Sequence, residues 1–180
     1  MSRQLLVITF LTFCSTLGAG PVCAETPRVR ALDGTIDALL VSGSAKSITF
    51  RTLLERLERS DVIVHVEPWP LQHGRRRVGG MLRFVTRAGG FRYVRISLSV
   101  HLPRDTAVAL LGHELQHALE VADDASVVDD ITFEALYHRI GDTCLDAAVV
   151  RTYDTSGARS AERRIREELR EFSRHLLARR

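Results

Sequence analysis

The amino-acid sequence predicts an α+β fold, with helices packed on one face of a small, mostly antiparallel three-stranded sheet. Short runs rich in β-branched residues follow one another in the first half of the chain. Longer stretches with apolar residues three and four positions apart fill most of the second half. Because hydrophobic residues make up 45% of the 180 residues, the chain can bury the core of one domain.

The strands are expected between residues 61 and 100. Residues 61–70, DVIVHVEPWP, are rich in β-branched side chains and contain two prolines that end the strand. Residues 79–87, GGMLRFVTR, and 91–100, FRYVRISLSV, are separated by a short turn with two glycines, which favours a hairpin. In the last segment polar and apolar side chains alternate, as they do in a sheet with one covered face.

Helices are expected on both sides of the strands. The first covers residues 47–60, where Ser47 can cap the start and apolar residues recur at helical spacing. A central helix runs from a cap at Asp105 or Thr106 to about Ala122. Its core-facing stripe would be Val108, Leu111, Leu115, Ala118 and Ala122. The further expected helices cover residues 131–141, 144–150 and 155–180.

Residues 1–24 have the three parts of a secretory signal peptide: a basic start at Arg3, an apolar run and a small-residue cleavage site that ends at Ala24. The mature chain would be exported to the periplasm or the extracellular space. It would consist of a flexible arm, residues 25–46, and a folded domain, residues 47–180. No later segment is apolar enough to span a membrane, although a retained N-terminal anchor is an alternative. Cys144 would be the only remaining cysteine, so no internal disulfide is expected.

The charge pattern argues against a nucleic-acid-binding surface. The formal net charge is only +3, and the arginines are interleaved with acidic residues rather than gathered in one basic stripe. The arginine run at residues 75–77 is expected to be a solvated loop, with recognition of an acidic substrate or envelope surface as the alternative. The arginines and glutamates of the last helix are expected to form a salt-bridged outer face.

The segment ALLGHELQHALEVADD, residues 109–124, places two histidines and a glutamate in the central helix. Side chains four residues apart lie one turn above each other, so His113 and His117 can bind the same metal ion. Two imidazole nitrogens and a carboxylate suit zinc and leave a fourth position for water. Glu114, rotated by about 100° along the helix, can reach that water as a general base. The HExxH pattern therefore predicts a zinc hydrolase site.

HELQH on a helix, with an amphipathic strand before it and more helices after it, resembles the zincin metallopeptidases, in particular their gluzincin-like layout. The resemblance covers about residues 90–170. It implies a zincin-like domain in which the strand before the motif helix, residues 91–100, lines the cleft and pairs with an extended peptide substrate. The longer stretch LLGHELQHALEVA also resembles small exported bacterial proteins with a GHELQHAxE motif.

Four acidic residues are candidates for the third metal ligand. Asp154 ranks first, because the exported proteins that the chain resembles have Tyr-Glu-Thr before a similar helix where this chain has Tyr-Asp-Thr. The third ligand of gluzincins also lies on a later helix. The alternative role of Asp154 is to cap the N-terminus of the last helix. Glu120 is better placed to hold the second ring nitrogen of His117. Glu134 and Asp130 follow, with solvent exposure and helix capping as their alternative roles.

Three further residues have alternative assignments. His101 precedes the motif helix and is expected on the surface, with a place in the cleft as the alternative. Tyr137 or Tyr153 could donate a hydrogen bond to a tetrahedral oxyanion, and each could equally pack in the core.

The sequence thus predicts an exported zinc peptidase. His113, His117 and Asp154 would hold the metal, and Glu114 would activate a metal-bound water to hydrolyse peptide bonds. The partners would be peptide or protein substrates, without nucleic acid or a membrane span, and no oligomeric state follows from the sequence. Two alternatives stay open: a non-catalytic envelope protein that keeps a zincin fold for metal binding or an interaction, and a structural domain without metal.

Overall fold

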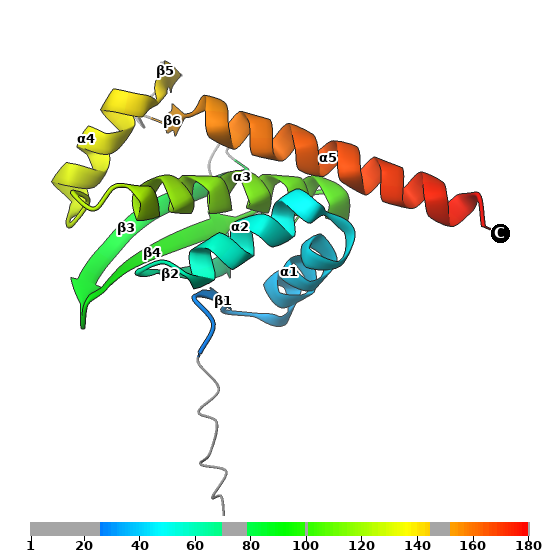
Figure 1. Ribbon diagram of the computed structural model, residues 1–180, viewed down its shortest axis with the longest axis horizontal. Helices are drawn as coiled ribbons and strands as arrows, with labels where there is room; N and C mark the ends of the chain where they lie inside the picture. Colours follow the sequence, from blue (N-terminus) through cyan, green and yellow to red (C-terminus); the bar gives the residue numbers. More distant parts are fainter. Residues whose placement is uncertain (1–25, 70–78, 100, 145–151, 180) are drawn as a thin grey trace, which may run out of the picture.

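The computed structural model describes residues 26–69, 79–99, 101–144 and 152–179. The expected signal peptide, the arginine run at 75–77 and most of the helix expected at 144–150 lie outside these residues. The described part of the chain has an α+β fold with five helices, a four-stranded sheet and a separate two-stranded sheet (Figure 1). No helix among the described residues is long and apolar enough to cross a membrane.

The main sheet contains β1 (Val29–Ala31), β2 (Val62–Pro68), β3 (Gly80–Ala88) and β4 (Phe91–Leu98), in the order β1-β2-β4-β3. Strands β1, β2 and β4 are parallel, and only β3 is antiparallel to its neighbour β4. The expectation of a mostly antiparallel three-stranded sheet is therefore wrong. Two helices connect β1 to β2, and such a crossover returns the chain in the same direction, which makes the pair parallel.

The expected hairpin between β3 and β4 is confirmed. Gly89 and Gly90 form its turn with φ angles of 58° and 82°, a left-handed conformation that glycine adopts without steric cost. The order of the strands also corrects a second expectation. Residues 91–100 were expected to pair with substrate, but β4 lies between β2 and β3 and has no free edge.

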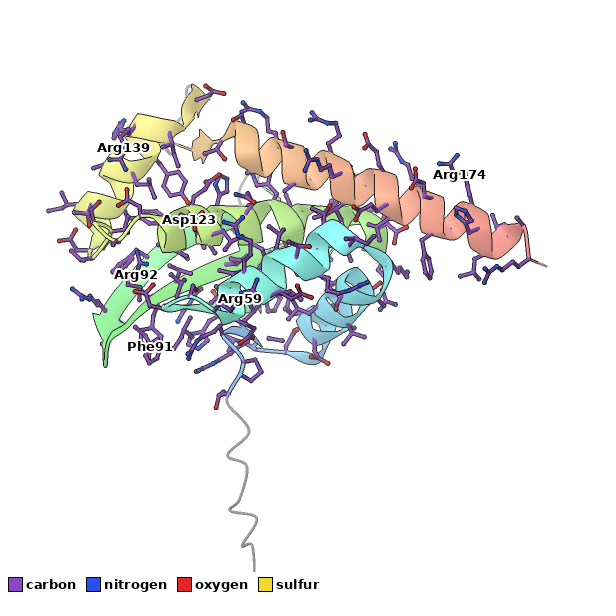
Figure 2. The ribbon with its side chains drawn as sticks, in the orientation of Figure 1. Arg59, Phe91, Arg92, Asp123, Arg139 and Arg174 are labelled. Carbon is purple, nitrogen blue, oxygen red and sulfur yellow. The ribbon has the colours of Figure 1, made fainter. Side chains whose placement is uncertain are left out.

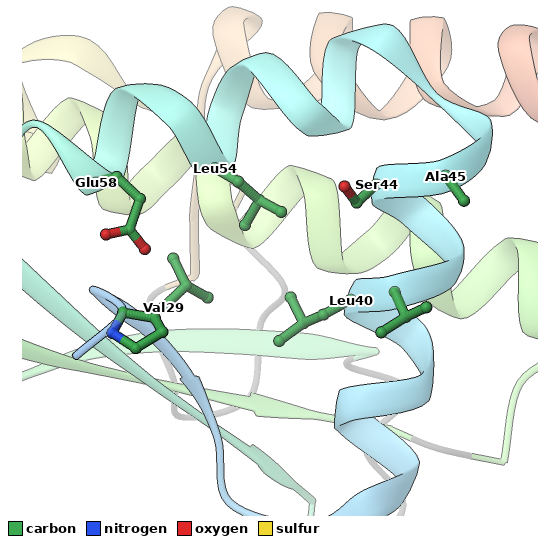
Figure 3. A pocket seen from close by; sticks show the side chains of 8 residues that line it. Val29, Leu40, Ser44, Ala45, Leu54 and Glu58 are labelled. Carbon is green, nitrogen blue, oxygen red and sulfur yellow. The ribbon is translucent and has the colours of Figure 1, made fainter. Parts of the chain in front are cut away.

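Residues 29–46 are folded, so the expectation of a flexible arm over residues 25–46 is wrong for them. They form β1 and helix α1 (Gly34–Lys46), whose first turn is capped by the Asp33 side chain. Ile36 and Leu39 are buried in the core. Apolar residues lie on several sides of α1, exposed Val41 among them, so no single stripe marks this helix in the sequence. An apolar groove separates α1 from α2 and β1 (Figure 3).

Helices α2 (Ile48–Glu58) and α3 (Arg104–Asp123) cover the inner face of the main sheet. Alternate strand residues such as Val64 and Ile96 meet the α3 stripe in one core. Of the expected α3 stripe, only Ala122 is not fully buried. Helix α3 begins after Pro103 without a side-chain cap, so the expected caps at Asp105 or Thr106 are wrong.

The remaining elements cover the other side of α3. They are α4 (Asp130–Ile140), the strands β5 (Asp142–Cys144) and β6 (Thr152–Asp154), and α5 (Ser156–Leu177). Strand β6 leads directly into α5, which Thr155 caps. Figure 1 shows α5 lying along α3 with its C-terminal part extending beyond the body of the fold. The buried stripe of α5 is Ala158, Ala161, Ile165 and Leu169.

A buried arginine fixes the far end of α3. Arg92 of β4 donates hydrogen bonds to the carbonyl oxygens of Val121 and Asp124, 2.6 and 2.7 Å away, and also pairs with the carboxylate of Asp61. The last carbonyls of a helix have no partner within the helix, and a cation satisfies them well. Figure 2 shows Arg92 near the end of α3, where Asp123 lies. The motif helix is thus held at its C-terminal end by the sheet.

Candidate metal centre

The two histidines of the motif converge on the side of α3 that faces away from the sheet. Their Nε2 atoms are 3.1 Å apart, and their rings meet edge to face with centroids 4.8 Å apart. Packing of α5 and α4 on this side buries them: the side chain of His113 is 13% exposed and that of His117 5%. The expected side-by-side placement of the two imidazoles is confirmed, but in a covered site rather than on an open helix surface.

The other nitrogen of each ring contacts a carboxylate. His113 Nδ1 lies 3.1 Å from Glu162 Oε2, and His117 Nδ1 lies 2.8 Å from Glu120 Oε2. An ionised carboxylate only accepts hydrogen bonds, so a neutral imidazole carries its proton on Nδ1 in both cases. The two Nε2 atoms then present lone pairs to each other. A hydrogen bond between them would require one ring to be protonated on both nitrogens.

Asp154 brings a third acceptor to the same point. Its Oδ1 atom lies 3.5 Å from His113 Nε2, is buried, and has no hydrogen-bond partner among the described residues. Its Oδ2 atom is 3.2 Å from Nη1 of Arg159, which also pairs with Asp142. Leaving a buried carboxylate oxygen without a partner is costly, so the site is arranged for something that attracts three acceptors.

A metal ion fits this arrangement. One ligand atom each from His113, His117 and Asp154 lies within 4.8 Å of the others, so the cluster could hold a metal ion. A tetrahedral ion with bonds of about 2.0–2.1 Å needs ligand atoms about 3.3 Å apart. The separations of 3.1 Å between the two Nε2 atoms and 3.5 Å between His113 Nε2 and Asp154 Oδ1 are close to that value, and all three ligand atoms lie within 4.8 Å of one another.

The electrostatics of the site favour positive charge. Burial alone lowers the pKa of His113, but the hydrogen bond with Glu162 and the charges of Glu114 and Asp154 outweigh it and raise the pKa above its usual value. The hydrogen bond with His113 also holds the pKa of Glu162 at about 2, with Arg166 adding to the effect against burial. The carboxylates that surround His113 therefore attract a cation into the site.

The side chain of Glu114 extends toward the start of β3 and lies within electrostatic reach of both histidines. It is 5% exposed, and burial raises its pKa although both histidines lower it. A β-carbon placed on Gly80 would lie 2.6 Å from Glu114 Oε1 and 2.9 Å from its Cγ. The backbone of β3 thus packs directly against this carboxyl group, which residue 80 permits only because it has no side chain. Glu114 is thus a buried carboxyl group packed against β3, and its burial favours the protonated form.

The other candidate ligands lie elsewhere. Glu120 supports His117 as expected, and Thr155 holds it from the other side with a hydrogen bond of 2.6 Å. Glu134 is half exposed and lies 3.5 Å from His138 on the same helix. Asp130 is exposed in the first turn of α4, and Asp129 rather than Asp130 caps that helix.

His101 and Tyr137 are not part of the metal cluster. His101 is exposed, as expected. Tyr137 is buried, and its hydroxyl donates to the backbone carbonyl of His117 at 2.9 Å, so the structure supports core packing for this residue. The side chain of Tyr153 lies outside the described residues, as does the arginine run at 75–77.

Two residues at the site were missed in the sequence. Glu162 was counted among the charges of the outer face of α5, because several glutamates there share the same helical pattern. Gly80 was assigned only to the strand expected at residues 79–87. Contact with the motif helix distinguishes each of them, and such contacts depend on how α5 and β3 pack rather than on local sequence.

Comparison of the chain with protein-family models, with curated proteins and with solved structures finds no significant match.

Proposed function

We propose that this protein is an exported zinc peptidase whose metal is held by His113, His117 and Asp154. The observation that carries this proposal is the convergence of two imidazole Nε2 atoms and the buried Oδ1 atom of Asp154 on one point. Two histidines and a carboxylate form the set of protein ligands found in catalytic zinc sites that leave one position open. Zinc rather than another metal is proposed from this ligand chemistry.

When bound, zinc would lower the pKa of a water molecule and polarise the carbonyl group of the peptide. Glu114 would take a proton from the attacking water as the water oxygen adds to the carbonyl carbon. It would return this proton to the leaving amine nitrogen as the C–N bond breaks. A carboxyl group with a raised pKa suits this task because it is a stronger base than an ordinary glutamate.

The substrate would bind along β3 rather than β4, because β3 is the edge of the sheet next to Glu114. The N–H of Ser99 donates to the carbonyl of Gly79 at 2.8 Å, which fixes the alternation of hydrogen bonds along this antiparallel pair. Among the described strands β3 is the outer one on this side, and the next residues whose N–H and C=O groups point away from β4 are Gly80, which is buried, and Leu82, which is half-buried. An extended peptide could add to this edge as a further strand, with its backbone beside Glu114.

The Glu114→Gln variant tests the proposal. We expect purified residues 25–180 to contain about one zinc ion per chain and to cleave an unstructured protein such as casein. Glu114→Gln should keep the metal and lose hydrolysis, while a His113→Ala, His117→Ala double variant should lose both. Glu134→Gln, which changes a carboxylate outside the site, is the matched control and should behave like the unmodified protein.

Each outcome separates the alternatives. Full hydrolysis by Glu114→Gln would refute the role of Glu114. Bound zinc without turnover of any peptide would favour a non-catalytic metal-binding protein of the cell envelope. Thermal stability that does not respond to zinc, together with no bound metal, would favour a structural domain.

A further inference from the structure

A row of basic and imidazole side chains crosses the outer face of the main sheet. The strand register places Arg30 opposite His65, His65 opposite Arg95, and Arg95 opposite Arg83. Opposed residues in a sheet project from the same face. Residues next to them in sequence, such as Val94, face the core, so this row lies on the face away from α3.

The row is electrostatically unbalanced. Like charges directly opposite each other destabilise a sheet. Glu67 is the carboxylate that pairs with Arg95, at 3.8 Å, and Arg95 Nε is buried without a hydrogen-bond partner among the described residues. Burial and the neighbouring Arg30 and Arg95 lower the pKa of His65, which is consistent with a positive potential along the row.

Arg83 is the member of the row that a strand on the free edge of β3 would meet. It is exposed, and within the described part of the chain no carboxylate pairs with it. A peptide residue opposite Arg83 would project its side chain on the outer face, with the two Cβ atoms about 5 Å apart. Arg95 lies on the next strand, about 4.8 Å behind. Arg83 is three residues from Gly80, which lies against Glu114.

We propose that this protein selects acidic polypeptides, through a contact between Arg83, backed by Arg95, and an Asp or Glu three residues away from the residue that pairs with Gly80. This inference rests on the proposed peptidase function. Two features favour a polypeptide over other polyanions. Strand β3 is the outer strand of the sheet in the described part of the chain, where a further strand can pair with its backbone, and the charged row begins at this strand.

Binding to the zinc-loaded Glu114→Gln protein tests the inference without relying on turnover. The probes are two fluorescein-labelled peptides of equal length, one with alternating Glu and Thr and one with alternating Gln and Thr, followed by fluorescence anisotropy. We expect the acidic peptide to bind about fivefold more tightly. Adding Arg83→Gln should remove this preference, and Arg83→Glu should transfer it to a peptide with alternating Lys and Thr.

The matched control, Arg164→Gln, removes one exposed arginine of α5 and should leave the preference intact. An equal loss in this control would show an effect of net charge and overturn the inference. Binding of heparin with the same dependence on Arg83 would overturn the choice of a polypeptide. Hydrolysis of both peptides at equal rates would refute the acidic preference and leave the peptidase standing. If the unmodified protein bound the acidic peptide without hydrolysing it, the acidic preference would stand and the peptidase function would be refuted.

Discussion

The Nδ1 atom of His113 lies 3.1 Å from Oε2 of Glu162, a residue 49 positions further along the chain. This contact connects the motif helix to α5, and Arg166 holds Glu162 in place through a 2.6 Å contact. A carboxylate on the second ring nitrogen fixes the tautomer and the direction of a metal-binding histidine. The last helix therefore does more than cover the core: it orients one of the two imidazoles.

Glu162→Gln should weaken zinc binding by about 10–100-fold, because an amide oxygen attracts the Nδ1 proton less strongly than a carboxylate does. The measurement is competition for zinc with a chelating dye at fixed pH. Glu167→Gln, an exposed change on the same helix, is the control and should leave the zinc affinity unaltered. Equal affinities for Glu162→Gln and the unmodified protein would show that the tautomer is set in another way.

Asp154→Ala should reduce zinc affinity by more than about 100-fold, since loss of a direct ligand exceeds the effect of losing an outer partner. The same dye competition measures it. Glu134→Gln and Asp130→Asn, which change two other acidic candidates, should keep zinc affinity because neither side chain lies at the site. A large loss in either of these variants, with Asp154→Ala unaffected, would assign the third ligand differently.

Gly80→Ala should lower kcat by on the order of 100-fold while zinc stays bound, because a 1 Å misplacement of a reacting group has about that effect. The new methyl group would overlap Glu114 Oε1, which lies 2.6 Å from the β-carbon position. Steady-state kinetics on casein peptides, with zinc content measured in parallel, is the readout.

Gly34→Ala is the matched control, since a β-carbon there meets no atom within 4 Å. It should leave kcat unchanged. If Gly80→Ala raised KM with kcat intact, Gly80 would affect substrate docking instead of the position of Glu114.

Local patterns in the sequence identified the elements whose signal is periodic. The helices at 47–60 and 155–180, the hairpin at Gly89 and Gly90 and the converging pair His113 and His117 all follow from spacing along the chain. Each depends on contacts within a few residues, where helical or strand geometry decides the outcome.

The expectations that failed concern contacts between distant segments. Strand β1 has only three residues and α1 lacks a single apolar stripe. The sequence patterns of these two elements therefore do not distinguish them from a flexible segment. The place of β4 inside the sheet follows from pairing with β2, about 30 residues earlier. Glu162 joined the site because α5 packs along α3. Several glutamates of α5 have the same local sequence pattern, and only tertiary packing places Glu162 at the site.

The carboxylate of Glu168 joins α5 to the start of α2 and should make stability depend on pH. It accepts hydrogen bonds from the backbone N–H of Thr49 at 3.1 Å, from the hydroxyl of Thr49 at 2.7 Å, and from the hydroxyl of Ser47. Burial raises its pKa, but these hydrogen bonds outweigh burial and lower the pKa below 4.5. A carboxylate whose pKa is lowered by folding stabilises the protein at pH values above its pKa in the unfolded chain. This contribution is lost as the pH falls through its pKa in the folded protein.

Glu168→Gln should therefore reduce the free energy of unfolding by about 1 kcal/mol at pH 7, where the carboxylate is ionised. The difference from the unmodified protein should shrink as the pH falls from about 4.5 toward the lowered pKa of Glu168 in the folded protein, below which both side chains are neutral. Urea unfolding at pH 7 and at lower pH values measures this. Glu167→Gln, one residue earlier and exposed, should change stability little at any pH. A loss that persists unchanged in acid would mean that Glu168 contributes through packing rather than through its charge.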